Sequence, residues 1–140
     1  MTLVPFDAAG KVSAAAKTGA WDVAFLARDA ERAREMTFTA AYVVIDGDYV
    51  VRKDSPLTSA GQVDTAGVRI VVSGQSAYDL FLARTLKHAQ LVRGGSTSEA
   101  LGLFLSGNYE AIAGVKQALQ QFVADDASVR MIPEPFMQIQ

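Results

Sequence analysis

The feature that most constrains the fold of this sequence is the run Gly74–Arg93, GQSAYDLFLARTLKHAQLVR. It follows the apolar segment Val68–Val72, which is typical of a strand covered on both faces, and Gly74-Gln75-Ser76 leads into an apolar-faced helix. A second predicted strand, Asp22–Ala27, precedes the charged turn Arg28–Arg32. Each turn places backbone N–H groups or a cation at the carboxyl end of a strand, where open α/β sheets bind small anionic ligands.

Short strands and helices alternate along the rest of the chain. Further strands are predicted at Thr2–Phe6, Tyr42–Ile45, Asp48–Arg52, Leu91–Arg93, Tyr109–Ala113, Val129–Ile132 and Phe136–Ile139. Helices are predicted at Ala8–Thr18, Asp29–Glu35, Thr58–Val63, Ser76–His88, Ala100–Leu105 and Lys116–Ala124. Asp46-Gly47 is typical of a hairpin turn. The alternation predicts parallel α/β layers, with one compact lobe over Val68–Ile132 and a smaller group over residues 1–53.

The composition argues against several classes of function. The net charge is −2 and both signs are interspersed, so no nucleic acid is expected as a partner. The chain has no cysteine and only one histidine, His88, so we expect no metal site and no cofactor. No apolar run approaches the roughly 18–20 residues of a membrane span. The first residues carry no signal-peptide pattern, which predicts a cytoplasmic chain as written.

The turn Gly74-Gln75-Ser76 has two interpretations. Glycine allows close approach of the backbone, and the free N–H groups of the first helical turn suit a carboxylate or phosphate. Alternatively, Ser76 is an ordinary N-cap paired with Asp79 three residues later. The turn is not a P-loop, because the lysine and the second glycine of that motif are absent.

The turn Arg28–Arg32 also has two interpretations. Arg32 can bind a carboxylate through two parallel hydrogen bonds, or it can be a surface charge on a short helix that Asp29 caps. The other aspartates are scattered like turn and cap residues, and no pair predicts two carboxyl groups with divergent pKa values. His88 has no nucleophile motif near it in the sequence. The residues therefore predict binding and no catalysis.

A set of ordered landmarks carries a resemblance to a known family. They are D-V-A-F before the arginine turn, F-T-x-x-Y, the S-P linker, G-V-R-I, G-x-S-A-Y-D-L-F-L, A-I-A-G-V and the closing F-M-x-I-Q. With them, the chain from about Leu3 to Gln140 resembles the bacterial extracellular solute-binding proteins of the polar amino-acid type. These are type 2 periplasmic binding proteins that feed ABC transporters.

The resemblance implies an α/β fold in which two lobes close over a ligand. The chain is expected to hold a partial first lobe plus a nearly complete second lobe with hinge strands. Residues 1–47 match the later part of the first lobe, 48–53 the first hinge strand, 54–133 the second lobe and 134–140 the returning hinge strand. The family's first strand and helix have no counterpart, so either a second copy fills the gap or the chain is a fragment; we predict the second copy, in a homodimer.

The resemblance also implies a ligand site between the lobes. The implied ligand-binding residues are Asp29, Arg32, Tyr42, Gln75, Ser76, Ala77 and Gly114. Arg32 stands where the family has its carboxylate-binding arginine, and Gln75 and Ser76 match the polar pair that holds the same carboxylate. Gly114-Val115 occupies the place of the family's amine-binding acid, so an α-amino group would lack its usual counter-ion.

The resemblance implies non-catalytic binding of a small polar or carboxylate-bearing solute. An ABC transporter permease is the implied protein partner, and the periplasm is the implied location. Two alternatives stay open: a ligand-free remnant that serves as an oligomerising structural module, and a dehydratase-like enzyme on the same scaffold.

Overall fold

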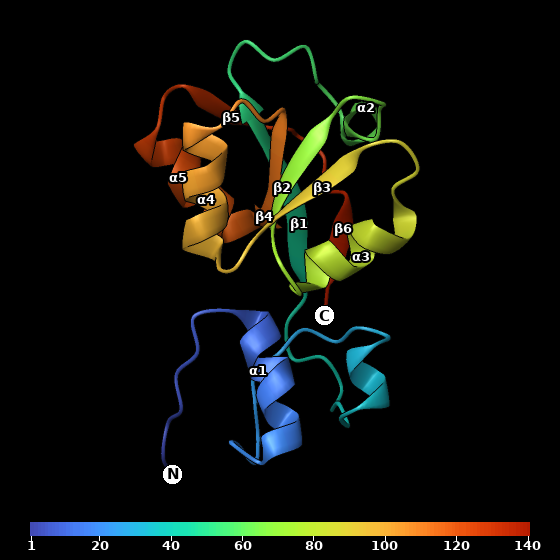
Figure 1. Ribbon diagram of the computed structural model, residues 1–140, viewed down its shortest axis with the longest axis vertical. Helices are drawn as coiled ribbons and strands as arrows, with labels where there is room; N and C mark the ends of the chain where they lie inside the picture. The colour runs from blue at the N-terminus through green and yellow to red at the C-terminus, as the bar shows by residue number, and fades with distance from the viewer.

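The computed structural model describes residues 1–140 and has two unequal parts (Figure 1). Residues 45–140 build a sheet with helices on both faces, and residues 1–44 form a segment without strands at one end of that sheet. The chain enters the sheet at β1 (Ile45–Arg52), and its C-terminus lies near the junction of the two parts. We call residues 1–44 the N-terminal segment and residues 45–140 the sheet lobe.

The sheet has six strands in the order β3-β2-β4-β1-β5, and β6 also pairs with β1. After β1, the strands are β2 (Arg69–Ser73), β3 (Gln90–Gly94), β4 (Ala111–Val115), β5 (Val129–Met131) and β6 (Met137–Ile139). The parallel α/β prediction is confirmed for β2, β3 and β4, which run parallel to one another. It does not extend to β1, which is antiparallel to β4, β5 and β6.

Helices cover both faces of the sheet. They are α2 (Ala60–Val63), α3 (Ala77–Thr85), α4 (Thr97–Ser106) and α5 (Lys116–Asp125). The core on the face of α2 and α3 comprises Tyr49, Val51, Val63, Val68, Ile70, Val72, Ala77, Tyr78, Leu82, Ala111, Ala113, Ile132 and Ile139. The core on the face of α4 and α5 comprises Val50, Val71, Ala100, Phe104, Ile112, Leu119 and Val129. Successive strand residues alternate between the two cores, as the pleat requires.

The order of the strands creates a switch point between β2 and β4. Helix α3 leads from β2 to β3 on one face, and α4 leads from β3 back to β4 on the other. Strands β2 and β4 pair only at Ile70–Ala111 and Val71–Ile112, so their carboxyl ends separate beyond those pairs. In open α/β sheets a crevice forms at such a point and is the usual place for a ligand.

The predicted hairpin at Asp46-Gly47 is wrong, because β1 runs through both residues without a turn. Gly47 pairs with Val115 on one side and Met137 on the other. A Cβ atom on Gly47 would lie 2.7 Å from the Met137 Cγ, so glycine serves close strand approach here. Long-range pairing on both sides of β1 overrides the local turn preference.

Two strands predicted in the N-terminal segment, Thr2–Phe6 and Asp22–Ala27, are also wrong, because both stretches lack strand structure. The segment contains α1 (Ala9–Ala15) and two short 3-10 helices, Ala16–Thr18 and Arg32–Arg34. No neighbouring strand hydrogen-bonds to Asp22–Ala27, and Val23 and Phe25 within it are exposed. Apolar composition alone therefore predicted a strand at Asp22–Ala27, although no neighbouring strand is present to hydrogen-bond its backbone.

The predicted strand Tyr42–Ile45 is also wrong, because only Ile45 belongs to a strand, and the predicted helix Asp29–Glu35 is reduced to the 3-10 turn Arg32–Arg34. The other predicted helices and strands are confirmed within a few residues. Helix α3 ends at Thr85 and not at His88, because the backbone is extended at Leu86. There the side chain of Asp64 accepts hydrogen bonds from the amides of Lys87, His88 and Ala89. None of the helices combines the length and the apolar character needed to span a lipid bilayer.

Candidate functional site

The N-terminal segment meets the sheet lobe at the turn that opens α3. Arg32 is only 3% exposed, and its Nη2 donates to the carbonyl oxygen of Gln75 at 2.6 Å. Its Nη1 donates to the carbonyl oxygen of Ala27 at 2.9 Å, within the segment. Burial lowers the pKa of Arg32, and the negative charge of Asp29 opposes that shift. A buried guanidinium therefore joins the two parts at the carboxyl end of β2.

Asp29 makes a second link between the two parts. Its Oδ2 lies 2.7 Å from the Arg84 Nη2 of α3, and its Oδ1 accepts a hydrogen bond from the Glu31 amide at 2.8 Å. Burial favours the neutral acid, but the bonds from Arg84 and the Glu31 amide outweigh it and lower the pKa of Asp29. Asp29 is therefore an ionised partner of α3 as well as the residue that shapes the turn before Arg32–Arg34.

The start of α3 is built by a reciprocal set of polar contacts. The Ser76 Oγ accepts a hydrogen bond from the Asp79 amide at 3.1 Å, which is the N-cap interpretation of this serine. The Asp79 carboxylate in turn accepts a hydrogen bond from the Gln75 amide at 2.8 Å and forms a salt bridge with Arg93 at 2.9 Å. Gln75 has a φ of 59°, a left-handed conformation that lets the chain reverse into the helix.

Two amides at this helix start stay free. The amide groups of Ala77 and Tyr78 donate no hydrogen bond within the protein, as expected for the first turn of a helix. They lie beside the Gln75 carbonyl to which Arg32 is bound. The cap and the anion-binding interpretations of this turn are therefore compatible, because Ser76 uses its side chain for the cap and leaves the backbone donors available.

The two parts approach closely around Gln75. A Cβ atom on Gly10 of α1 would lie 2.5 Å from the Gln75 Cβ and 3.3 Å from the Gly74 carbonyl oxygen. The amide of Arg28 donates to the carbonyl oxygen of Gln140 at 2.6 Å. The N-terminal segment is therefore closed onto the sheet lobe, and its own groups occupy the hydrogen bonds across the junction.

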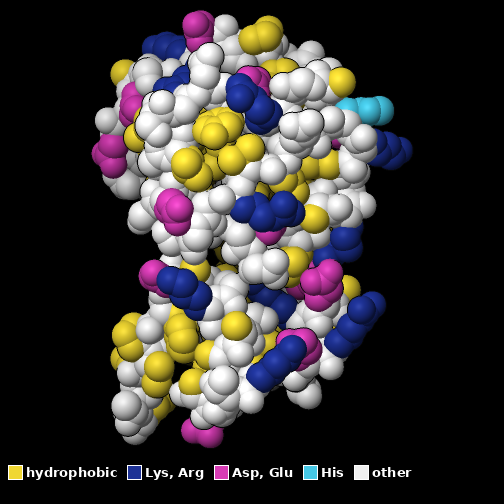
Figure 2. Space-filling model, in the orientation of Figure 1, with side chains coloured by type: hydrophobic (Ala, Val, Ile, Leu, Met, Phe, Trp, Pro, Cys, Tyr) yellow, Lys and Arg dark blue, Asp and Glu magenta, His cyan; other side chains and the backbone are white.

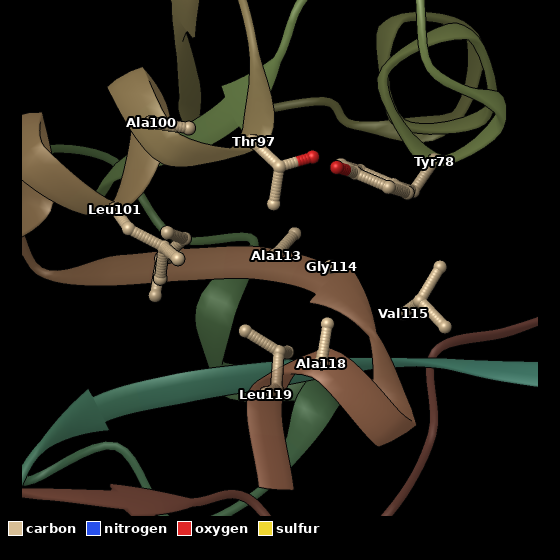
Figure 3. Close-up of a pocket in the computed structure, with 10 residues that line it drawn as sticks. Tyr78, Thr97, Ala100, Leu101, Ala113, Gly114, Val115, Ala118 and Leu119 are labelled. Atoms are coloured by element: carbon tan, nitrogen blue, oxygen red, sulfur yellow. The ribbon is translucent and has the colours of Figure 1, made fainter. Parts of the chain in front are cut away.

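The crevice predicted by the strand order is present next to this junction (Figure 3). It has a volume of about 70 Å³ and is lined by α3, α4, β4 and α5. Its lining residues are Tyr78, Thr97, Ala100, Leu101, Ile112, Ala113, Gly114, Val115, Ala118 and Leu119. Eight of these ten are hydrophobic and none carries a charge, so the crevice favours an apolar group.

Two hydroxyl groups face each other across one side of the crevice. Figure 3 shows the side chains of Tyr78 and Thr97 pointing toward one another from α3 and α4. Neither hydroxyl makes a hydrogen bond to another protein group, and the Tyr78 hydroxyl keeps some exposure although Tyr78 as a whole is only 7% exposed. Both hydroxyls are therefore available to hydrogen-bond a polar atom of a ligand in the crevice.

The structure brings most of the predicted site residues together. Asp29, Arg32, Gln75, Ser76 and Ala77 lie at the junction through the contacts described above. Gly114 lines the adjoining crevice, where a Cβ atom would meet the Leu119 side chain at 3.2 Å.

Tyr42 is the exception among the predicted residues. It is 78% exposed, and its ring meets the Phe25 ring edge-on with a centroid distance of 6.0 Å. Phe25 belongs to the same N-terminal segment and is also exposed. Tyr42 therefore contributes to an apolar surface of the segment and makes no contact with the α3 turn in this structure.

Sequence reasoning missed Asp48, which was assigned with the other aspartates to turns and caps. It lies within β1 opposite Gly114, is buried, and its Oδ1 has no hydrogen-bond partner. Burial raises the pKa of Asp48; the positive charge of Lys116 opposes the shift and Asp46 adds to it. No local sequence signal could have indicated this burial, because it depends on the pairing of β1 with β4. No three acidic or histidine side chains gather as metal ligands.

Comparison with known proteins gives a fold but no sequence family. No protein-family model matches the chain, and no curated protein sequence matches it at a significant level. Among solved structures, holo ArgBP from T. maritima superposes with a TM-score of 0.80 at 19% identity, over 94% of this chain and 58% of that one. A putative binding component of an ABC transporter from Wolinella succinogenes DSM 1740, complexed with lysine, gives 0.81 at 18% identity, over 99% and 61%.

A third neighbour is an ancestral amino acid-binding protein, AncCDT-1, described as a precursor of cyclohexadienyl dehydratase. It superposes with a TM-score of 0.77 at 18% identity, over 97% of this chain and 60% of that one. The chain therefore spans about three fifths of the length of these neighbours. The expected resemblance is confirmed at the level of fold. This chain has the fold of the type 2 periplasmic binding proteins, with a partial first lobe and a nearly complete second lobe.

Proposed function

We propose that the chain takes part in non-catalytic binding of a small carboxylate-bearing solute at the junction of the N-terminal segment and the sheet lobe. The observation that carries the proposal is the position of Arg32. Its buried guanidinium lies within hydrogen-bonding distance of the turn that opens α3, where the Ala77 and Tyr78 amides are free. A cation and unpaired amides at a helix N-terminus form an electropositive site that suits a carboxylate.

Binding requires the two parts to separate first. In the closed structure Arg32 donates to the neutral carbonyl groups of Gln75 and Ala27. A ligand carboxylate is a stronger acceptor for guanidinium than a neutral carbonyl, so it can replace the Gln75 carbonyl when the segment opens. The chain passes from the N-terminal segment into the sheet lobe at the start of β1, and the end of β6 lies beside that point. The start of β1 and the end of β6 are therefore the natural hinge.

The direct test is isothermal titration calorimetry with a panel of carboxylates, using Arg32→Ala and Arg34→Ala. Both arginines belong to the same 3-10 helix, but Arg34 is exposed and makes no hydrogen bond through its side chain. Loss of a charge-assisted bond should weaken binding in Arg32→Ala by about 1.5–3 kcal/mol, or roughly 10- to 150-fold. Equal affinities in the two variants would refute the role of Arg32.

An oligomerising module is the second candidate, favoured by the surface of the N-terminal segment. Figure 2 shows hydrophobic side chains gathered over this part of the molecule. The exposed large apolar residues of the segment are Met1, Leu3, Val4, Val23, Phe25, Tyr42, Val43 and Val44. A surface of this kind marks a contact with a partner, and a second copy of the chain in a homodimer would cover it. Analytical ultracentrifugation that finds only monomers at high concentration would exclude the homodimer.

An enzyme on the same scaffold is the third candidate, because one neighbour in fold is the precursor of a dehydratase. The carboxylates near the α3 turn weigh against it: Asp29 is paired with Arg84, and Asp79 with Arg93. Paired carboxylates with satisfied hydrogen bonds are poor proton donors and acceptors. Turnover of hydroxy acids or keto acids by the purified chain, with a pH dependence, would favour the enzyme over the binding protein.

The proposed setting follows from the proposed binding. A solute-binding component of an ABC transporter works in the periplasm and delivers its ligand to the permease. Fold neighbours that include the lysine complex from Wolinella succinogenes support this setting. Crosslinking of the chain to a membrane permease in periplasmic extracts, dependent on the ligand, would support it further, and its absence would leave binding without transport.

A further inference from the structure

We infer that the preferred ligand of the junction site is a short carboxylate with a branched aliphatic tail and no α-amino group. The inference rests on the proposed function and names its substrate class. It follows from placing the apolar crevice of β4 beside the α3 turn, since one ligand can then contact both. The carboxylate lies at the free amides of Ala77 and Tyr78, and the tail enters the crevice.

The size of the crevice sets the size of the tail. A cavity measured in this way needs roughly 10–15 Å³ for each water-sized atom. The volume of about 70 Å³ therefore holds about five to seven such atoms. Isocaproate has five carbon atoms beyond its carboxylate, which matches that capacity. Acetate leaves most of the crevice unfilled, and a tail with two fused aromatic rings exceeds it.

The lining of the crevice sets the chemistry of the tail. The side of the crevice toward α4 and α5 is formed by Ala100, Leu101, Ala118 and Leu119, which offer no hydrogen bond from their side chains. A methyl group there replaces water that these residues cannot bind, and each buried CH₂ group adds about fourfold in affinity. The free hydroxyl of Tyr78 lies on the side toward α3 and Thr97, where it can donate to the ligand's carboxylate.

The charges around the crevice disfavour an ammonium group. None of its lining residues is acidic, and Gly114 has no side chain to place a charge there. The carboxylates nearby are engaged, Asp79 with Arg93 and Asp46 with Lys116. Asp48 faces Gly114 across the strand pair, but it does not line the crevice. An ammonium group at the α3 turn would also lie close to the Arg32 guanidinium, and burying it without a counter-ion is costly.

The test compares three ligands by isothermal titration calorimetry with the full chain: isocaproate, leucine and isocaproamide. Leucine differs from isocaproate only by the α-amino group, and isocaproamide replaces the carboxylate with a neutral amide. We expect isocaproate to bind at least tenfold more tightly than either. A preference for leucine over isocaproate would overturn the inference while leaving the proposed function intact. Loss of that preference in Asp48→Asn would then identify Asp48 as the counter-ion.

Two variants locate the tail. Ala118→Leu adds bulk at the edge of the crevice, and Gln120→Leu makes a similar change at an exposed position of α5 outside it. We expect Ala118→Leu to weaken isocaproate binding at least tenfold and Gln120→Leu to leave it unchanged. Tyr78→Phe keeps the ring and should weaken binding about three- to tenfold. Equal affinities of Ala118→Leu and wild type would show that the tail lies elsewhere. If none of the three ligands binds but another carboxylate of the panel does, the inference fails and the proposed function stands; if no carboxylate of the panel binds, both fail.

Discussion

The N-terminal segment and the sheet lobe are held together by different forces. The segment contributes three of the 31 buried residues, Ala8, Asp29 and Arg32, and two of these are charged. The sheet lobe contributes the other 28, most of them apolar residues in two cores on either side of the sheet. Apolar burial holds the lobe as one unit, whereas the segment depends on a few directional polar contacts with it.

This difference agrees with the proposal that movement and binding occur at the same surface, the junction of the two parts. Contacts such as Arg32 with Gln75 and Asp29 with Arg84 can be exchanged for contacts with a ligand at little cost. A core residue cannot be exchanged in this way, because it would leave a cavity. In the proposed function, the segment is therefore the part that opens, and the sheet lobe is the platform on which the ligand is bound.

The largest expected contrast is between two phenylalanines, one in each part. Phe104 of α4 is fully buried and packs edge-on against Phe122, so Phe104→Ala should lose about 3–5 kcal/mol of unfolding free energy. Phe25 is 82% exposed, so Phe25→Ala should change stability by no more than about 0.5 kcal/mol in either direction. Urea unfolding measures both. A large loss in Phe25→Ala would mean that the segment has a covered core.

The ion pair across the junction should matter more than an ion pair within the segment. Arg84→Ala leaves the buried carboxylate of Asp29 without its partner and should cost about 1–3 kcal/mol. Lys11→Ala removes an exposed pair with Asp7 and should cost under about 1 kcal/mol. Thermal unfolding of the two variants gives the comparison. Similar losses would contradict the view that the junction relies on buried charge.

The same pair gives the pH dependence a definite sign. The pKa of Asp29 is lower in the folded chain than its ordinary value of about 3.9 in the unfolded chain. Its stabilisation is therefore fully present above about pH 4 and is lost as the pH falls through the folded pKa. Wild type and Arg84→Ala should converge in stability at acidic pH. A difference between them that persists undiminished below that range would contradict the assignment.

Asp48 should behave in the opposite way within the sheet lobe. The pKa of Asp48 is raised in the folded chain. The unfolding free energy therefore falls as the pH rises from about 4 to the folded pKa, and it stays reduced above that pH. At neutral pH, Asp48→Asn should therefore raise the unfolding free energy by about 1 kcal/mol and the melting temperature by a few degrees. Below about pH 4 the variant should give no gain. A loss of stability at neutral pH would mean that the charge of Asp48 has a partner.

The smallest contrast is between the two serine caps of the sheet lobe. The Ser76 hydroxyl accepts a hydrogen bond from the Asp79 amide of α3 at 3.1 Å. The Ser96 hydroxyl accepts one from the Glu99 amide of α4 at 3.2 Å. Replacement of either by alanine should cost about 1 kcal/mol. Only Ser76→Ala should also weaken binding of a carboxylate, because only α3 begins at the junction. Calorimetry on both variants separates the cap from the binding role.

The sequence was informative where local chemistry decides structure. The helix starts at Ser76 and Ser96 follow from their cap residues, and the buried strands β2 and β4 follow from continuous apolar runs. These signals predicted a compact lobe over Val68–Ile132 and the α3 turn. The role of that turn stays a prediction, since its residues are compatible with both a cap and a binding site.

The sequence was misleading where distant residues decide structure. Asp46-Gly47 is typical of a turn, but β4 and β6 pair with it from both sides and extend β1 through it. The apolar run Asp22–Ala27 is typical of a strand, but no strand lies beside it. The burial of Asp48 and the crevice between β2 and β4 also depend on residues far away in the chain, and no local pattern encodes them.

Hydrogen–deuterium exchange with and without isocaproate or leucine tests the central claim most directly, since that claim joins both parts at one ligand. Our account predicts that a saturating ligand slows exchange in two separate stretches, residues 27–35 of the segment and residues 75–79 at the start of α3. The same protection should be lost in Arg32→Ala and retained in Arg34→Ala. No protection in either stretch, or protection in only one of them, would contradict a ligand site at the junction.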